Sequence, residues 1–329
     1  MSHTRAAGSP PAIEASGLTK MFGRAEKRTT AVDHVDLVVP AGGVYAVLGT
    51  NGAGKTTTVR MLATLLRPDA GSARIFGADV VRRATSVRAM IGVTGQYASV
   101  DEDLTATENL VVFGRLVGAS RSAARARAHE LLEEFGLTGA ADRPIRQFSG
   151  GMRRRLDLAA SMITRPRLLF LDEPTTGLDP RTRAQMWNTV RRLVSDGSTV
   201  LLTTQYLDEA DELADHVAVM DRGKVVADGT TDELKAKVGD TRAVIGIADA
   251  DRLADAGAVC SAFASAEVIV ADPDLRVVVP MPDVDRLPEL LLALRERSIA
   301  FTAVNVEKPS LDEVFFELTD GGSGTGEAA

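Results

Sequence analysis

Residues 49–56 read Gly-Thr-Asn-Gly-Ala-Gly-Lys-Thr and fit the phosphate-binding loop pattern G-x-x-x-x-G-K-[ST] at every fixed position. A short apolar run, residues 44–48, precedes this loop. Apolar residues then recur at helical spacing at Val59, Leu62, Leu65 and Leu66. The loop is therefore predicted to connect a strand to a helix, as the motif requires. The alternative is an ordinary glycine-rich turn, but the lysine, the hydroxyl and the glycines all agree with phosphate binding.

The residue types in this loop suit a nucleotide. Gly49, Gly52 and Gly54 let the backbone turn its amides toward a phosphate, and the N-terminus of the following helix adds a partial positive charge. Lys55 is expected to reach the β- and γ-phosphates, and the hydroxyl of Thr56 is expected to bind Mg²⁺.

The composition narrows the class of protein. A chain of 329 residues with 45% hydrophobic content is long enough for one large α/β domain and a smaller one. The net charge of −7 argues against a nucleic-acid partner, because proteins that bind nucleic acids usually present a basic surface to the phosphates. A single cysteine, Cys260, excludes an intramolecular disulfide and is interpreted as a small buried hydrophobe. No stretch reaches the roughly 18 apolar residues of a membrane-spanning helix, so a membrane function would need another chain to supply the span.

Two acidic residues follow a strand that is predicted to be buried on both faces. Residues 168–171 are Leu-Leu-Phe-Leu, and Asp172 and Glu173 come directly after them. In open α/β sheets, ligands bind at the carboxyl ends of the strands. Asp172 can orient Mg²⁺, and Glu173 can accept the proton of an attacking water.

Two further positions each allow a functional and a purely structural interpretation. Phe22 is an aromatic residue in a polar, turn-like segment and can stack on a nucleotide base, although packing under the sheet edge explains it equally well. Ser149-Gly150-Gly151 begins a predicted helix with Ser149 as the N-cap. This helix start forms either a second anion site or a plain capped terminus. The arginines at 153–155 receive no role.

The remaining segments predict the domain organisation. Residues 104–136 are helical in pattern, with Leu131, Leu132 and Phe135 buried and the arginines between 121 and 127 solvated. Past about residue 239, a hairpin around residues 268–279, a helix stripe from Leu287 and a strand at 301–306 indicate a small α+β domain. Its last helix carries a predicted Ser310–Glu313 capping box.

The order of these motifs resembles the ATP-binding subunit of an ABC transporter over roughly residues 13–235. The motifs are the phosphate loop, Gln96, Ser149-Gly150-Gly151, Asp172-Glu173 and Gly177-Leu178-Asp179. The resemblance implies a P-loop ABC ATPase core with a helical subdomain at about 97–163, within an ATP-binding domain at 13–238. An accessory α+β domain at 239–319 follows, and residues 1–12 and 320–329 are expected to be disordered tails.

The resemblance also implies a role for each matching residue. The nucleotide site would comprise Phe22, Gly49, Asn51, Gly52, Ala53, Gly54, Lys55, Thr56, Thr57, Gln96, Ser149, Gly150, Gly151, Asp172 and Asp179. The catalytic groups would be Glu173, Lys55 and Gln205, and Mg²⁺ would be held by Thr56, Gln96 and Asp172. Ser149 to Gly151 would bind ATP held by the opposite subunit, and Asp179 would cross the interface of a head-to-tail dimer.

A closer similarity, to the daunorubicin-resistance branch of drug exporters, is carried by residues 93–97, 148–155, 203–206 and 311–315. Similarity to this branch implies that the chain energises the export of a drug-like or lipid-like compound, such as an anthracycline-type antibiotic, through a separate multi-span permease. The subunit would then lie at the cytoplasmic face of the cell membrane, as a homodimer or with a paired ABC subunit. Three positions depart from the wider family, because Phe148 replaces leucine, Met152 replaces glutamine, and Gln205 replaces the switch histidine.

Two other functions remain as alternatives. One is an ABC-type ATPase that acts on a non-transport target such as ribosomes or DNA, which usually has two cassettes or a long coiled-coil insertion. The other is a small-molecule kinase with the same loop, which leaves Ser149 to Gly151 and Gln205 unexplained.

Overall fold

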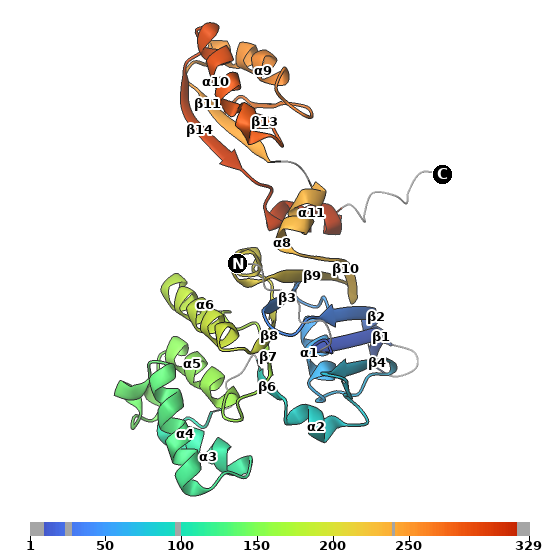
Figure 1. Ribbon diagram of the computed structural model, residues 1–329, viewed down its shortest axis with the longest axis vertical. Helices are drawn as coiled ribbons and strands as arrows, with labels where there is room; N and C mark the ends of the chain where they lie inside the picture. The colour runs from blue at the N-terminus through green and yellow to red at the C-terminus, as the bar shows by residue number, and fades with distance from the viewer. Residues whose placement is uncertain (1–9, 24–27, 96–99, 239–240, 321–329) are drawn as a thin grey trace. The chain divides into compact units, whose positions relative to one another are not determined.

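The structure is a computed structural model that describes residues 10–23, 28–95, 100–238 and 241–320. The chain forms two compact units, and the first ends at Thr230 while the second begins at Thr231. Figure 1 shows the helices and strands of both units.

A six-stranded sheet in the order β10-β9-β3-β8-β7-β6 forms the centre of the first unit. Its strands are β3 (Val44–Leu48), β6 (Ile91–Thr94), β7 (Leu168–Asp172), β8 (Thr199–Thr204), β9 (His216–Asp221) and β10 (Lys224–Gly229). All pairs are parallel except β9 with β10. Every residue of β3, β7 and β8 is buried. These strands therefore lie in a sheet that is covered on both faces, which confirms the prediction made for residues 168–171.

A second, antiparallel sheet in the order β2-β1-β4-β5 packs against the central one through a shared core that includes Ile13, Leu37, Met61 and Phe170. Its strands are β1 (Ile13–Phe22), β2 (Thr29–Val39), β4 (Ala70–Ile75) and β5 (Ala78–Asp79). The sequence of residues 69–72, Asp-Ala-Gly-Ser, is typical of a turn and predicts one there, as it predicts a turn-like segment at Phe22. Both predictions were wrong. Pairing with neighbouring strands extends β1 to Phe22 and starts β4 at Ala70, because cross-strand contacts outweigh local polarity.

Seven α-helices in the described part of the first unit complete it: α1 (Lys55–Leu62), α2 (Ala84–Arg88), α3 (Ala106–Leu116), α4 (Arg121–Glu134), α5 (Gly150–Ser161), α6 (Pro180–Ser195) and α7 (Leu207–Leu213). Figure 1 shows α3, α4 and α5 together, between β6 and β7 in the chain. Side chains cap all three, from Thr105, Ser120 and Ser149. In α4 the arginines 121 and 125 are exposed while Leu131 and Leu132 are buried, which confirms the predicted faces.

The second unit contains α8 (Thr231–Val238), β11 (Arg242–Ile247), α9 (Leu253–Ser261), β12 (Ile269–Ala271), β13 (Arg276–Pro280), α10 (Leu287–Glu296), β14 (Phe301–Glu307) and α11 (Leu311–Asp320). Its strands form an antiparallel sheet in the order β12-β13-β11-β14, which is the βαββαβ arrangement of ferredoxin-like domains. Ile245, Val277, Leu290 and Leu294 share its core with Cys260. Burial raises the pKa of the Cys260 thiol to about 11, and confirms its interpretation as a buried hydrophobe.

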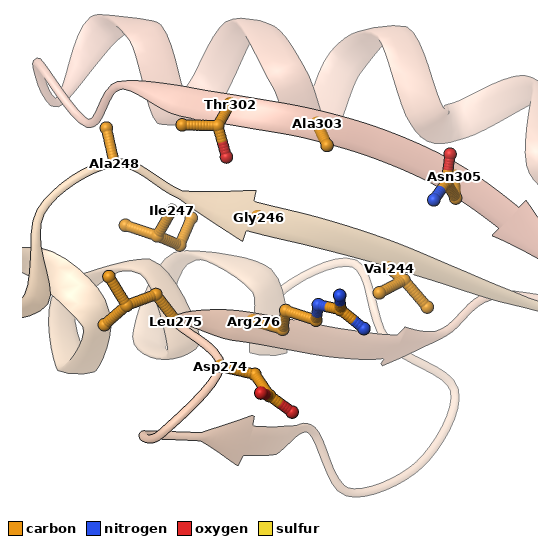
Figure 2. Close-up of a pocket in the computed structure, with 10 residues that line it drawn as sticks. All are labelled: Val244, Gly246, Ile247, Ala248, Asp274, Leu275, Arg276, Thr302, Ala303 and Asn305. Carbon is orange, nitrogen blue, oxygen red and sulfur yellow. The ribbon is translucent and has the colours of Figure 1, made fainter.

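The opposite face of this sheet carries a shallow cavity of about 360 Å³ (Figure 2). Val244, Arg276 and Asn305 line it from three adjacent strands. Val244 pairs with Asn305, while Ala243 and Ile245 on either side face the core. This alternation is that of a half-covered antiparallel sheet, with one face packed on helices and the other open.

The helix α11 packs against α8 within the second unit. Leu311 and Val314 of its predicted apolar stripe are buried. The Ser310 hydroxyl accepts a hydrogen bond from the Glu313 amide at 3.3 Å, which is one half of the predicted capping box. The Glu313 carboxylate forms an ion pair with Arg242 on β11.

Two leucines near the end of α1 test the importance of the core that supports the phosphate loop. Leu62 is fully buried, whereas Leu65 is 65% exposed. We expect Leu62→Ala to lower the free energy of unfolding by about 2–5 kcal/mol. Leu65→Ala should change it by about 0.5 kcal/mol or less. Urea unfolding, followed by the fluorescence of Trp187, the single tryptophan, measures the free energy of unfolding of both variants. Equal losses of this free energy in the two variants would contradict the packing described here.

Candidate functional site

The phosphate loop joins β3 to α1, as the motif predicts, and two of its glycines have no room for a side chain. A Cβ at Gly49 would lie 2.4 Å from the Met220 carbonyl oxygen, and one at Gly54 would lie 2.5 Å from that of Ala31. Gly54 also has a φ of 104° and is the N-cap of α1. In the described chain no side chain caps this helix start, so its amides remain available to an anion.

Lys55 is held across the loop by its own backbone. Its ammonium nitrogen donates to the carbonyl oxygens of Gly49 at 2.8 Å and Thr50 at 3.1 Å, and lies 3.4 Å from Glu173 Oε1. Burial lowers the pKa of this lysine, and the nearby Glu173 carboxylate partly offsets that effect. The side chain is 4% exposed, so its charge lies inside the loop where phosphates would lie.

Asp172 and Glu173 lie at the carboxyl end of β7, as predicted. Asp172 Oδ1 accepts hydrogen bonds from the hydroxyls of Thr56 at 3.0 Å and Thr203 at 2.6 Å. The Glu173 amide donates to the hydroxyl and the carbonyl of Thr203, both at 3.1 Å. The structure therefore brings Lys55, Thr56, Asp172 and Glu173 together, and adds Thr203, which the sequence did not single out.

A hydroxyl and a carboxylate that face each other are the hard oxygen donors that Mg²⁺ prefers, so Thr56 and Asp172 fit this ion. The described residues contain no cluster of three or more His, Cys, Asp or Glu side chains placed to hold a metal. The third predicted ligand, Gln96, lies outside the described residues. Mg²⁺ commonly takes its other ligands from water and substrate phosphates, and two protein oxygens are consistent with that habit.

Gln205 lies at the same edge of the sheet. Thr203 pairs with Asp172 in the parallel register of β8 and β7, and Gln205 follows β8 by one residue. The turn is fixed on both sides, because the Thr204 carbonyl accepts from the Gly49 amide at 3.2 Å and the Thr204 hydroxyl accepts from the Tyr206 amide at 2.9 Å. The half-buried Gln205 side chain is therefore carried by a turn that is bonded to the phosphate loop.

Phe22 ends β1 and is 46% exposed, with the Lys20 ammonium 5.8 Å from the centre of its ring. Nearly half of the residue is open to solvent and the rest is covered by the protein. Another group therefore has room to lie against the ring.

The Ser149 and Asp179 positions are both N-caps. The Ser149 hydroxyl accepts from the Met152 amide at 3.3 Å, and Asp179 accepts from the Thr182 amide at 3.0 Å. Bonds from Thr182 hold the pKa of Asp179 below its ordinary value. A Cβ at Gly151 would lie 2.3 Å from Thr182 Cγ2, so only glycine allows α5 to approach α6 this closely.

The exposed surface of this second turn is formed by Ser149 and Gly150. A Cβ at Gly150 would meet no described atom within 4 Å. Phe148, which departs from the family's leucine, is 6% exposed and so fills an apolar position beneath the turn. The glycine-rich turn therefore faces outward and keeps its backbone accessible.

A buried glutamate and a largely buried arginine of the site carried no signal in the sequence. Glu209 is completely buried in α7 and accepts from the Thr175 hydroxyl at 2.8 Å and the Trp187 indole nitrogen at 3.1 Å. Burial raises its pKa. Arg154 binds backbone carbonyls at the ends of β6 and β7. Both sets of partners are distant in the sequence, so local pattern could not reveal them.

Comparison with known proteins places these features in a family. A family model described as ABC transporter matches residues 32–176. The daunorubicin/doxorubicin resistance ATP-binding protein DrrA of Streptomyces peucetius is 53% identical over 94% of this chain and 92% of its own length. The doxorubicin resistance ATP-binding protein DrrA of Mycobacterium tuberculosis is 45% identical over 94% and 93%. The Nod factor export ATP-binding protein I of Ralstonia nicotianae is 43% identical over 69% and 70%.

Solved structures agree with these relatives. An ATP-binding subunit of an ABC transporter matches with a TM-score of 0.60 and 27% identity, over 69% of this chain and 92% of that one. A bacterial ABC transporter cassette, solved as a dimer, matches with a TM-score of 0.61 and 25% identity, over 66% and 98%. None of the helices in the described ranges could cross a membrane. The chain belongs to the ABC transporter family, among the ATP-binding proteins of daunorubicin and doxorubicin resistance.

Proposed function

We propose that this chain hydrolyses ATP at the loop of residues 49–56 to drive the export of a drug-like compound through a separate membrane permease. The observation that carries the proposal is the group of Lys55, Thr56, Asp172 and Glu173 at one edge of the sheet. The relatives are named for drug resistance and for Nod factor export, which supports a transport role. They do not favour the alternative of an ABC-type ATPase with a non-transport target.

The binding step uses the loop backbone and Lys55. The amides at the start of α1 and the ammonium of Lys55 would surround the β- and γ-phosphates. Thr56 and Asp172, with Gln96, would hold Mg²⁺, which when bound neutralises charge on the phosphate oxygens. Phe22 would stack on the adenine at the exposed end of β1.

In the proposed hydrolysis, Glu173 is the general base. Its carboxylate lies one residue past the end of β7, and its amide is fixed by Thr203. Glu173 would accept a proton from the attacking water while Lys55 stabilises negative charge on the γ-phosphate. Gln205 would donate a neutral hydrogen bond to the water or to the γ-phosphate, in the position that histidine occupies in the wider family.

The outward-facing turn at Ser149 to Gly151 supports a head-to-tail dimer. Because Ser149 and Gly150 are exposed, they can bind the γ-phosphate of ATP held by a second subunit. Asp179 would lie at the same interface. The partner would be a second copy or a paired ABC subunit, and the pair would work at the cytoplasmic face of the membrane through its permease.

Glu173→Gln should keep ATP binding and abolish turnover, because an amide of the same shape cannot act as a base. The expected product is an ATP-bound dimer, visible by size-exclusion chromatography with light scattering in the presence of Mg²⁺. Glu133→Gln, an exposed acid on α4, is the control and should retain turnover. A Glu173→Gln protein that stays monomeric with ATP would contradict the head-to-tail dimer.

Phe22→Ala should weaken ATP binding if the ring stacks on adenine. Base–aromatic stacking contributes about 1–3 kcal/mol, which corresponds to roughly a 5- to 150-fold change in the dissociation constant. Phe22→Trp should preserve binding because it keeps an aromatic face. Titration with a fluorescent ATP analogue gives the dissociation constant of the wild type and of both variants. A dissociation constant of Phe22→Ala equal to that of the wild type would show that Phe22 does not contact the nucleotide.

Gln205→Ala should lower turnover by about 10², the usual effect of losing one preorganised donor. Gln205→His should remain active and add an ionisation between about pH 5 and 8, where imidazole titrates. The wild type should show no ionisation from position 205. Steady-state ATPase rates across this pH range compare the three forms, and an alanine variant as active as wild type would show that Gln205 takes no part.

A further inference from the structure

The side chain of Arg154 reaches from α5 to the ends of two strands of the central sheet. Its guanidinium donates to the carbonyl oxygens of Gly95 at 2.6 Å, Asp172 at 3.0 Å, Glu173 at 3.1 Å and Pro174 at 3.0 Å. Gly95 follows β6, and the other three residues end β7 or follow it. One side chain therefore joins a helix to the two strand ends that lead to Gln96 and Glu173.

The chemistry of arginine suits this position. At the carboxyl ends of parallel strands, carbonyls lie beyond the regular pairing of the sheet and need other donors. A guanidinium offers five N–H groups in a rigid fork, whereas a lysine ammonium is a compact point charge. Arg154 satisfies four such carbonyls from three nitrogen atoms, which fixes the backbone on both sides of the catalytic carboxylate.

The backbone that Arg154 holds is an unusual one. Glu173 has a φ of 50°, in the left-handed region that non-glycine residues rarely adopt. Such a conformation persists only when its surroundings determine it. Thr203 fixes the amide of Glu173 from β8, and Arg154 fixes its carbonyl from α5. The direction of the Glu173 carboxylate therefore depends on contacts from two different elements.

The neighbouring arginines on α5 have different partners. Arg153 pairs with Glu102 at 2.7 Å, and Arg155 donates to the Phe135 carbonyl at 3.3 Å. Neither of these partners belongs to the catalytic edge of the sheet. The two residues therefore provide controls that share the helix, the residue type and the charge of Arg154.

The charge of Arg154 is compensated within the site. The side chain is 12% exposed, and burial lowers its pKa. Asp157, Asp172, Glu209 and Glu173 act in the opposite direction and favour the charged form. A buried guanidinium among four acids is stable only while these partners remain in place, which argues for a fixed rather than a mobile side chain.

We propose that Arg154 is a positioning residue that transmits the placement of α5 to Glu173. The inference rests on the proposed ATP hydrolysis. Arg154 lies five positions after Ser149, the N-cap of α5. The same helix therefore carries the turn that would bind the opposite subunit's ATP and the side chain that holds the Glu173 backbone. Closure of the dimer on Ser149 to Gly151 then sets the direction of the Glu173 carboxylate, which accepts the proton of the water that attacks the chain's own ATP.

The test compares Arg154→Gln with Arg153→Gln and Arg155→Gln in steady-state ATPase assays. A misplacement of the reacting groups by about 1 Å can cost 10²-fold, so we expect kcat to fall by about 10- to 100-fold in Arg154→Gln. The dissociation constant for ATP should stay within about threefold, since Arg154 does not touch the phosphate loop. Both control variants should keep kcat within about threefold of wild type.

A second measurement separates positioning from folding. In a Glu173→Gln background, adding Arg154→Gln should leave the ATP-bound dimer in place, because the proposed role lies in hydrolysis. Arg154→Lys should retain the charge and recover part of kcat, and it replaces the glutamine variant if that protein does not fold. Its kcat should still lie at least about threefold below wild type, because an ammonium cannot span four carbonyls.

Three results would overturn the proposal. The first is a kcat of Arg154→Gln close to that of the wild type. The second is a loss of ATP binding, and of stability measured by Trp187 fluorescence, that accompanies the loss of kcat. The third is a loss of kcat in Arg155→Gln equal to that in Arg154→Gln. Absence of ATP hydrolysis in the wild type and in both controls would instead refute the proposed function.

Discussion

The hydrogen bonds that Asp172 accepts from Thr56 and Thr203 are the contacts on which the site depends. They join α1, β7 and β8, which are far apart in the chain, at a single carboxylate oxygen. The parallel register of β7 with β8 makes this possible, because it places Thr203 beside Asp172. A shift of one residue would turn Asp172 to the other face of the sheet. The completely buried strands that enforce this register therefore also position Asp172 and Thr203 at the edge of the candidate site.

The phosphate loop and the acidic strand end were predictable from the sequence because each signal is local. The loop pattern covers eight consecutive residues, and the acids directly follow four apolar ones. Long-range partners were not predictable. Nothing near Arg154 in the chain distinguishes it from Arg153 and Arg155, and its carbonyl partners begin 18 residues away. The burial of Glu209 likewise depends on contacts with α6 and with the loop after β7.

In the second unit, too, only the elements with a clear local sequence pattern were predictable. The β12–β13 hairpin, α10 and β14 were predicted because alternating or helical apolar patterns mark them. No sequence pattern predicted β11 or α9. The strand β11 contains Gly246, which is depleted in strands, and α9 is rich in alanine with Gly257 in its middle, so its pattern is weak. Both elements form because their neighbours in the sheet and core complete them.

The candidate site also has an electrostatic constraint that the local motifs do not reveal. Asp157, Asp172 and Glu209 are buried within it, together with the largely buried Glu173. Burying several carboxylates without partners would cost more than a domain of this size can offset. Lys55 approaches them from the phosphate loop and Arg154 from α5, while Thr56, Thr175 and Thr203 supply neutral hydroxyl donors. Hydroxyls can bind a carboxylate without cancelling its charge, so Asp172 stays available to a cation. Threonine hydroxyls therefore lie beside the Asp172 carboxylate, and the Arg154 guanidinium lies at the backbone behind it. A guanidinium in place of the threonines would neutralise the carboxylate and fill the space beside it, which is the position proposed for Mg²⁺.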